Sequence, residues 1–297
     1  QFERLDMVAV ALAGFTWGIY WIHLRALDQA GLTGVWAILL FYLVPTVLLA
    51  PLLVIRRRQL IAGGWPLHVA GLLAGVSLVL YAGALIFTDV VRALLLYYLT
   101  PIWSTLLAWI VLGEPISRLR WVTIGLGALG LGLLLRIDAG LIAPFNTGDW
   151  MGFGAGLIWA MAAVWMRKHQ DISGTDFTLS YFLWGSVAAC VLVTLSFASG
   201  ESAPTWTMLN GVLPWLVPLV VILVIPPAFA VMWGATVLSP GLLAILFMTE
   251  ISAGTVTAAL FAQEPLGWRE ILGVLVISAA GVLEPVMAAR NVRKSRS

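Results

Sequence analysis

The sequence predicts an all-α integral membrane protein whose ten transmembrane helices form two inverted five-helix repeats. Composition, the spacing of long apolar segments and an internal repeat each support this class. Hydrophobic residues make up 61% of the 297 residues and charged residues 10%, against roughly 45–50% and 25% in soluble domains. The mean hydropathy is +1.01. A water-soluble fold of this size cannot cover so much apolar surface, so we expect the lipid bilayer to be its surroundings.

Charge and metal-ligating residues argue against several other classes of protein. The net charge of +2 is too small to suggest a nucleic-acid partner, because such partners select strongly basic surfaces. Cys190 is the only cysteine, which excludes a disulfide framework and a cysteine metal cluster. His23, His68 and His169 lie near segment ends without a His-Glu-x-x-His pair. With no Gly-Lys-Ser/Thr phosphate loop either, we expect no metal, no cofactor and no ATP hydrolysis.

Ten segments are long enough to cross the hydrocarbon core, which takes about 20 apolar residues. They are residues 7–27, 33–55, 66–87, 92–112, 119–136, 150–167, 176–198, 211–236, 240–262 and 268–288. The longest break, residues 137–149, divides the chain. We therefore expect one repeat in residues 1–140 and a second, with a basic tail, in residues 141–297.

The distribution of Lys and Arg predicts the orientation. Of the 16 basic residues, Arg25, Arg92, Arg136 and Arg269 fall on the outer side if the amino terminus is inside, and the other 12 fall on the inner side. Cytoplasmic segments carry the excess of positive charge. The sequence thus predicts a multi-pass protein of the bacterial inner membrane with both termini in the cytoplasm.

Two pattern matches indicate that the halves repeat each other. The first runs from Gly14 and Trp17 to Gly156 and Trp159, 142 positions later. The second, 150 positions apart, relates residues 97–115 to residues 247–265 and keeps a threonine (Thr105, Thr255) and a Glu-Pro pair (Glu114-Pro115, Glu264-Pro265). Because each half has five spans, the second half is inverted relative to the first. Inverted repeats are typical of secondary transporters, with the binding site between the halves near the midplane.

The pattern Leu99-Thr100-Pro101 followed by Leu112-Gly113-Glu114-Pro115 and a glycine-rich segment resembles the EamA repeat of the drug/metabolite transporter superfamily. The resemblance extends over all ten spans. The aromatic stretch 97–103 is most similar to the YddG-type exporters of aromatic amino acids. This resemblance implies export and a cavity among spans one, three, four, six, eight and nine. Many members of the superfamily carry Glu-Pro in span nine where this chain has Glu250-Ile251, so a helix break there is left open.

Glu250 lies about halfway along its predicted span. A charged side chain at that depth costs roughly 3 kcal/mol on insertion scales, so it should face a cavity or a partner. Three roles are open: a partner for the substrate's amine, a proton-coupling group, or a neutral carboxyl that caps a gap in the backbone.

Two stripes of small and polar residues recur at helical spacing on spans three and four. They are Ser77, Tyr81, Ala84 and Thr88, and Tyr97, Thr100, Pro101, Ser104 and Ala108. Such faces line protein or water and not lipid. They indicate either a shared cavity or ordinary hydrogen bonding between helices.

Several aromatic residues and breaks complete the candidate site. Deep tryptophans stack on ring-bearing solutes or pack the core, and Pro226-Pro227 removes two backbone donors within a span, which suits a hinge or an ammonium site. The candidate substrate-binding residues are Trp17, Trp21, Ser77, Tyr81, Tyr97, Tyr98, Thr100, Ser104, Trp159 and Glu250. No catalytic residue is predicted.

Several glycine patterns are interpreted as positions of close helix packing. They are the pairs Gly14/Gly18, Gly71/Gly75 and Gly152/Gly156 and the pattern Gly125-x-Gly127-x-x-Gly130.

The sequence therefore favours a secondary transporter, and not an enzyme, that exports small neutral, mainly aromatic or hydrophobic amino acids by alternating access. We expect it to act as a monomer. Export of drugs or other metabolites by the same fold is the alternative. An intramembrane lipid-modifying enzyme is disfavoured because the spans contain no cluster of His, Asp and Ser with catalytic spacing.

Overall fold

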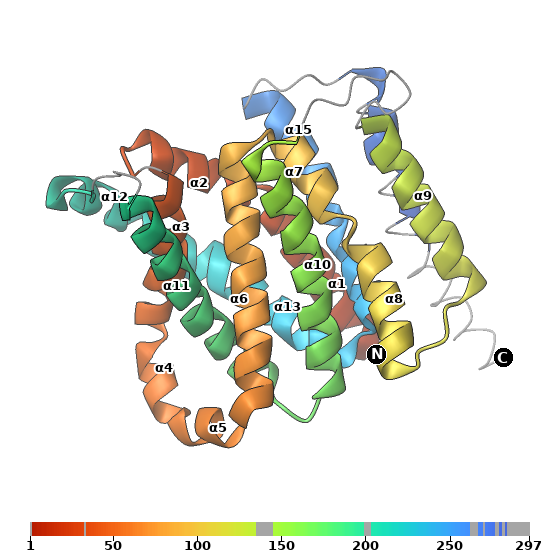
Figure 1. Cartoon of the computed structure of the whole chain (residues 1–297), viewed down its shortest axis with the longest axis horizontal. Coiled ribbons are helices and arrows are strands. Elements are labelled where there is room, and N and C mark those ends of the chain that lie inside the picture. Colours follow the sequence, from red (N-terminus) through yellow and green to blue (C-terminus); the bar gives the residue numbers. More distant parts are fainter. Residues whose placement is uncertain are drawn as a thin grey trace.

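The computed structural model describes residues 2–32, 34–134, 145–198, 203–261, 267–269, 271–276, 279–280 and 283. Within these residues every regular element is helical (Figure 1). In chain order the elements are α1 (Phe2–Gly18), α2 (Tyr20–Gln29), α3 (Gly34–Leu48), α4 (Ala50–Ile55), α5 (Arg57–Ala62), α6 (Gly64–Phe87), α7 (Val90–Tyr97), α8 (Thr100–Leu112), α9 (Arg118–Leu134), α10 (Thr147–Lys168), α11 (Gly174–Ala198), α12 (Trp206–Leu219), the π-helix η2 (Val220–Val224), α13 (Ile225–Val237), α14 (Pro240–Phe247) and α15 (Thr249–Phe261).

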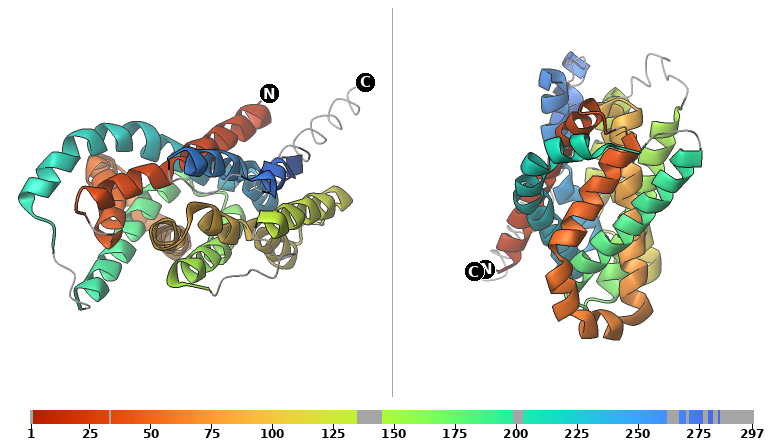
Figure 2. Two further views of the ribbon diagram at one scale, coloured as in Figure 1. Left: turned by 90° about the horizontal axis from the view of Figure 1, so that it is seen from above. Right: turned by 90° about the vertical axis from the view of Figure 1, so that its left-hand side faces the viewer.

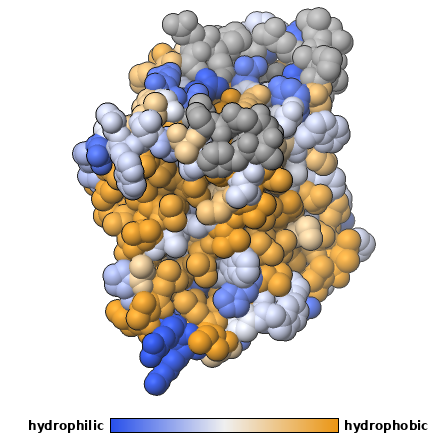
Figure 3. Space-filling view, turned by 60° about the vertical axis from the view of Figure 1, so that its left-hand side comes forward, coloured by the Kyte–Doolittle hydropathy of each residue, from blue (hydrophilic) through white to orange (hydrophobic). Residues whose placement is uncertain are grey.

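Six helical segments in this part of the chain are long and apolar enough to cross a membrane. They are Leu5–Gln29, Gly64–Phe87, Val90–Leu112, Gly174–Leu195, Trp206–Val237 and Pro240–Phe261. They correspond to the first, third, fourth, seventh, eighth and ninth predicted spans. The face seen in Figure 3 agrees with this assignment, because apolar residues cover most of its middle and hydrophilic residues lie toward its upper and lower ends. The prediction of a multi-pass helical membrane protein is confirmed at this level.

The other four predicted spans remain predictions. The second contains the shorter apolar helix α3, which continues into α4. The fifth and sixth fall on α9 and α10, and the tenth, residues 268–288, lies mostly outside the described residues.

Helix α6 lies in the middle of the bundle, flanked by α10 and α11 (Figure 1). Glycines permit this close contact: a Cβ on Gly71 would lie 2.7 Å from the carbonyl oxygen of Ser180, and one on Gly75 would lie 2.5 Å from the amide nitrogen of Gly185. On the other side α1 packs against α13 and α15. The helix-packing interpretation of Gly71 and Gly75 is confirmed.

Pro226 and Pro227 leave no non-helical gap in the eighth predicted span. Pro226 and Pro227 lie in the first turn of α13, where a missing N–H is tolerated, and the π-helix η2 precedes them. The run from α12 to α13 curves along one side of the bundle when seen from above (Figure 2, left). Pro226 lines an apolar hollow of about 230 Å³ together with Leu49 and Phe229.

Two spans are interrupted by a short break between consecutive helices. Helix α7 ends at Tyr97 and helix α14 ends at Phe247, 150 positions later, and each is eight residues long. Their N-cap residues, Asp89 and Ser239, share φ −63° and ψ 142°. After Tyr97 the break follows from Pro101, which has no N–H to donate to the Tyr97 carbonyl, and the Thr100 hydroxyl donates to that carbonyl instead.

The second break occurs without a proline. The Ile251 amide donates to the Met248 carbonyl at 3.1 Å, which leaves the Phe247 carbonyl to another donor. The break that the Glu250-Ile251 sequence left open is therefore present, directly before Glu250.

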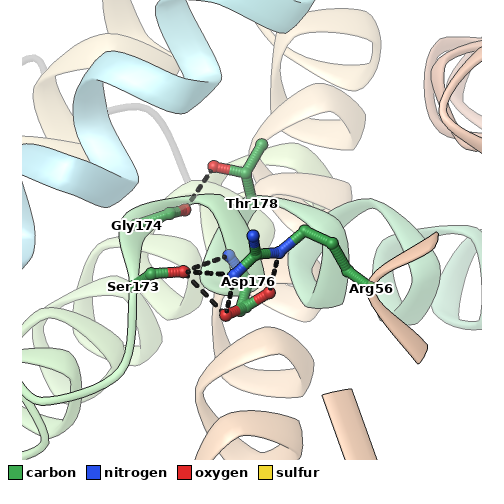
Figure 4. Close-up of polar contacts among 5 residues, drawn as sticks. All are labelled: Arg56, Ser173, Gly174, Asp176 and Thr178. Carbon is green, nitrogen blue, oxygen red and sulfur yellow. Dashed lines mark hydrogen bonds and ion pairs between the residues drawn. The ribbon is translucent and has the colours of Figure 1, made fainter. Parts of the chain in front are cut away.

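Ion pairs fasten the bundle at opposite ends of α6. At one end Arg56, after α4, holds Asp176 of α11 through Nε–Oδ1 and Nη2–Oδ2 contacts of 2.7 and 2.9 Å, and Ser173 donates to the same carboxylate (Figure 4). The hydrogen bond to Asp176 raises the pKa of the Arg56 guanidinium. At the other end Arg92 lies 2.8 Å from the buried carboxylate of Asp149, which also accepts from Thr88.

Candidate functional site

Glu250 is the second residue of α15 and is fully buried, with 0% of its surface exposed. Its carboxyl lies where three chain segments meet. The Tyr81 hydroxyl, from α6, donates to Oε1. The Tyr98 hydroxyl, from the α7–α8 break, lies 2.5 Å from Oε2 and also 2.5 Å from the carbonyl oxygen of Phe247. A hydroxyl at the α7–α8 break therefore pairs with the carboxyl that follows the α14–α15 break.

The hydrogen bonds at this centre depend on whether Glu250 carries a proton. Tyr98 has one hydroxyl hydrogen and two neighbouring acceptors. When Glu250 is protonated, it donates to the Tyr98 oxygen, Tyr98 donates to Phe247, and Tyr81 donates to Oε1, so every group is paired. When Glu250 is ionised, both hydroxyls turn to the carboxylate and the Phe247 carbonyl loses this donor. A buried polar atom without a partner is unfavourable. Gain or loss of a proton at Glu250 is thus tied to bonding at the helix break.

Aromatic rings surround the carboxyl. The ring of Tyr97 lies 4.5 Å from that of Tyr81 and 5.2 Å, at 90°, from that of Tyr98. Beside the second break, Trp17 packs against Phe247 at 6.0 Å in an edge-on arrangement and stacks on Tyr20 at 5.8 Å. The centre therefore combines one carboxyl with hydroxyls and ring faces.

Glycines bring the flanking helices against both breaks. A Cβ on Gly14 would lie 2.4 Å from Thr249 Oγ1, and one on Gly18 would lie 2.6 Å from the Glu250 carbonyl oxygen. On α10, a Cβ on Gly156 would lie 2.3 Å from the Tyr97 carbonyl oxygen. The matched glycines Gly14 and Gly156 thus each contact one break, which confirms their interpretation as packing positions.

Of the predicted binding residues, the structure brings Tyr81, Tyr97, Tyr98 and Glu250 together, and Trp17 joins them through Phe247. The others contact different groups. Ser77 donates to the Ala155 carbonyl at 2.8 Å and Thr100 to the Tyr97 and Gly156 carbonyls, both as contacts between or within helices.

Three predicted residues are buried outside this set of contacts. The Trp21 indole donates to the Thr257 hydroxyl at 3.1 Å, and Thr257 lies on α15 about two turns after Glu250. Trp159 is part of the hydrophobic core. Ser104 is buried, and within the described residues its hydroxyl has no hydrogen-bond partner.

The stripe on the fourth span was predicted on one continuous helix. The break at Tyr98 and Leu99 instead divides it, with Tyr97 on α7 and Thr100 to Ala108 on α8. Phe247, whose carbonyl accepts a hydrogen bond from Tyr98, was not among the residues predicted from the sequence. The signal was available, because Phe247 is the repeat counterpart of Tyr97.

In the part of the chain that the structure describes, no three His, Cys, Asp or Glu side chains lie together in a way that could hold a metal ion. The groups that the Glu250 centre offers to a ligand are one carboxyl, two hydroxyls and several aromatic rings.

Residues 5–136 match the EamA-like transporter family. An uncharacterized transporter of Synechocystis sp. is 26% identical over 226 residues, which cover 72% of this chain and 64% of that protein. An uncharacterized transporter of Vibrio cholerae serotype O1 is 31% identical over 140 residues, covering 44% and 45%. Each alignment spans less than two thirds of the relative's length.

The crystal structure of one protein superposes with a TM-score of 0.65 at 18% identity, over 95% of this chain and 98% of that one. At this identity the likeness shows a shared fold alone. The chain thus combines six apolar helices of membrane-spanning length with a first half that is similar to the EamA-like transporter family and with similarity to two uncharacterized transporters.

Proposed function

We propose that the chain is a secondary transporter that exports small neutral, mainly aromatic or hydrophobic amino acids across the bacterial inner membrane by alternating access. In this proposal residues 1–140 and 141–297 are two inverted repeats, both termini are cytoplasmic, and the monomer is the working unit. The observation that supports it most is the fully buried Glu250 carboxyl, held by Tyr81 and Tyr98 between two broken helices.

The groups around Glu250 match the parts of an aromatic amino acid. Ionisable side chains inside the membrane commonly mark substrate or proton pathways. A substrate ammonium can donate to the Glu250 carboxylate, while the rings of Tyr81, Tyr97 and Trp17 offer faces for an aromatic side chain. In the structure the two tyrosine hydroxyls occupy the carboxyl oxygens. When an ammonium supplies those donors, Tyr98 is released to pair fully with the Phe247 carbonyl.

Counterflow in proteoliposomes with a panel of labelled amino acids tests this function. The wild type and Glu250→Gln are compared across a pH series. If Glu250 exchanges protons, the substitution abolishes the pH dependence of transport. If it pairs with the ammonium, the substitution chiefly raises the substrate concentration needed, because a charge-assisted contact is lost. We expect a reduced rate in either case.

Asp171→Asn serves as a matched control, since Asp171 is an exposed carboxylate in the connection between α10 and α11. It should keep wild-type kinetics. Wild-type kinetics and pH profile in Glu250→Gln would remove Glu250 from the mechanism. Counterflow of ring-bearing amines, with none for amino acids, would favour the drug or metabolite alternative.

The substrate class is tested by Tyr97→Ala in the same assay. Loss of a ring contact of about 1 kcal/mol lowers the apparent affinity for Phe and Trp several-fold. Thr, which has no ring, should be affected less. Equal losses for all three substrates would show that Tyr97 acts in packing and not in recognition.

A further inference from the structure

A pocket of about 270 Å³ with several polar lining residues lies away from Glu250, toward the far end of α8. Its polar lining comes from four segments: Thr105 of α8, Glu114 and Ser117 of the connection to α9, Arg120 of α9, and Ser239, the N-cap of α14. The volume lies just below the range of about 300–1,000 Å³ that is usual for ligand pockets. It therefore suits a solute of small size.

Thr105 is 3% exposed, and its hydroxyl has no hydrogen-bond partner within the residues that the structure describes. Ser104, the preceding residue, is also buried, and its hydroxyl also has no hydrogen-bond partner among the described residues. Helical threonines and serines usually satisfy their hydroxyls with a carbonyl in the preceding turn, and a buried hydroxyl without a partner is uncommon in native folds. Thr105 thus lines the pocket with a hydroxyl that is unpaired among the described residues.

Charged groups of both signs border the same space. A Cβ added to Gly241 would lie 1.7 Å from Arg120 Nη1 and 3.0 Å from Thr105 Oγ1, so the guanidinium and the hydroxyl converge there. Glu114 lies on the pocket wall with 31% of its side chain exposed, 3.7 Å from Arg167. A guanidinium with a neighbouring hydroxyl suits a carboxylate, and the Glu114 carboxylate suits an ammonium.

The pocket and the Glu250 centre share two helices. Thr105 follows Tyr98 by seven residues and Ser239 precedes Phe247 by eight, which at the helical rise places the pocket about 10–12 Å from the centre along both α8 and α14. These two helices pack against each other. In the topology predicted from the sequence, the Arg120 end is cytoplasmic, the side from which an exporter takes up its substrate.

We propose that this pocket is a loading site that binds the zwitterionic head group of an α-amino acid before it reaches Glu250. Arg120 and Thr105 take the carboxylate, and Glu114 takes the ammonium. The substrate class rests on the proposed function, but the site shares no residue with the Glu250 centre.

Protection of a single cysteine from alkylation tests the proposal. Cys190 is the only cysteine of the chain, so Cys190→Ser gives a background without thiols. Ile116→Cys then places one thiol in the pocket wall, and Arg58→Cys places one at an exposed position on the same predicted side. Both are labelled with a membrane-impermeant maleimide in proteoliposomes.

Phenylalanine should slow labelling at position 116 several-fold and leave position 58 unchanged. Phenethylamine lacks the carboxylate and 3-phenylpropionate lacks the ammonium, so neither should protect at the same concentration. Equal protection by either analogue, or none by phenylalanine, overturns the proposal.

Two valine substitutions separate a binding role from a structural one. Thr105→Val keeps the shape and removes a hydroxyl that pairs with no described protein group, so folding should be unaffected. The phenylalanine concentration that half-protects position 116 should rise about tenfold, as expected for loss of a hydrogen bond to a charged group. Thr255→Val is the matched control, because Thr255 is the repeat counterpart and its hydroxyl is likewise buried without a described partner. An unchanged value in Thr105→Val contradicts the site.

Failure of this inference differs from failure of the proposed function. Protection at position 116 should persist in Glu250→Gln, because the pocket does not use that carboxyl. Counterflow of phenylalanine without protection would overturn the loading site and keep the transport function. Absence of counterflow for every amino acid, with no protection, would overturn both.

Discussion

The two tyrosine hydroxyls at Glu250 make unequal numbers of contacts, which predicts unequal effects on stability. Tyr98 serves both the Glu250 carboxyl and the Phe247 carbonyl, whereas Tyr81 serves the carboxyl alone. Hydrogen bonds between helices in membrane proteins contribute about 0.6 kcal/mol on average and up to about 1.7. Tyr81→Phe should therefore lower the free energy of unfolding by about 0.6–1.7 kcal/mol, and Tyr98→Phe by about twice as much, roughly 1.2–3.4 kcal/mol.

A double-mutant cycle assigns these losses to their partners. In a Glu250→Leu background, Tyr81→Phe should cost close to nothing because its acceptor is gone. Tyr98→Phe should keep about half of its effect, which is the share that belongs to the Phe247 carbonyl.

The measurement is the free energy of unfolding in mixed micelles, followed by tryptophan fluorescence, with identical lipid and detergent for every variant. Tyr20→Phe is the control, since the Tyr20 hydroxyl makes no hydrogen bond with the described residues and its ring contacts would be kept. Equal losses for Tyr81→Phe and Tyr98→Phe, or losses that persist unchanged in the Glu250→Leu background, would refute the reasoning.

Two further predictions concern packing and topology. Gly156→Ala places a Cβ 2.3 Å from the Tyr97 carbonyl oxygen, so thermal unfolding should show a loss of stability of about 1–3 kcal/mol, as overpacking causes. Gly125→Ala is the control and should be neutral in the same assay, because its Cβ meets nothing within 4 Å. Similar melting temperatures for the two variants would contradict the packing role of Gly156. Reporter fusions at Gly148 and at the carboxyl terminus should read outside and inside respectively, and two inside readings would contradict the ten-span topology.

The class of fold and six of its apolar helices could be predicted from the sequence because membrane thickness fixes the length of a spanning helix. Residues 66–87 were predicted where Gly64–Phe87 is observed, and residues 240–262 where Pro240–Phe261 is observed. A hydropathy window needs only local composition. It is therefore accurate for boundaries and insensitive to what happens within a span.

Only some of the residues that gather around Glu250 were predicted, and their arrangement was not. Glu250 and Tyr81 were identified because a polar side chain within an apolar span is expected to face a cavity or a partner, and Tyr98 because it belongs to the aromatic stretch 97–103. Their pairing could not be predicted, since spacing arguments assume an unbroken helix and α7 ends at Tyr97.

The break before Glu250 had no local signal of its own, because no proline follows it. The Phe247 carbonyl freed by the break is satisfied by Tyr98, 149 positions away in the sequence. Close approach of Gly14 to the same point completes the packing. Such partners exist only in the folded chain.

The glycine contacts define two places where a helix lies directly against a helix junction. Gly14 and Gly18 leave no side chain between α1 and the junction of α14 with α15, and Gly156 does the same for α10 and the junction of α7 with α8. Glu250 lies in the first of these contacts and Tyr98 in the second, so the hydrogen bond between them joins the two, and any movement that separated them would have to break it.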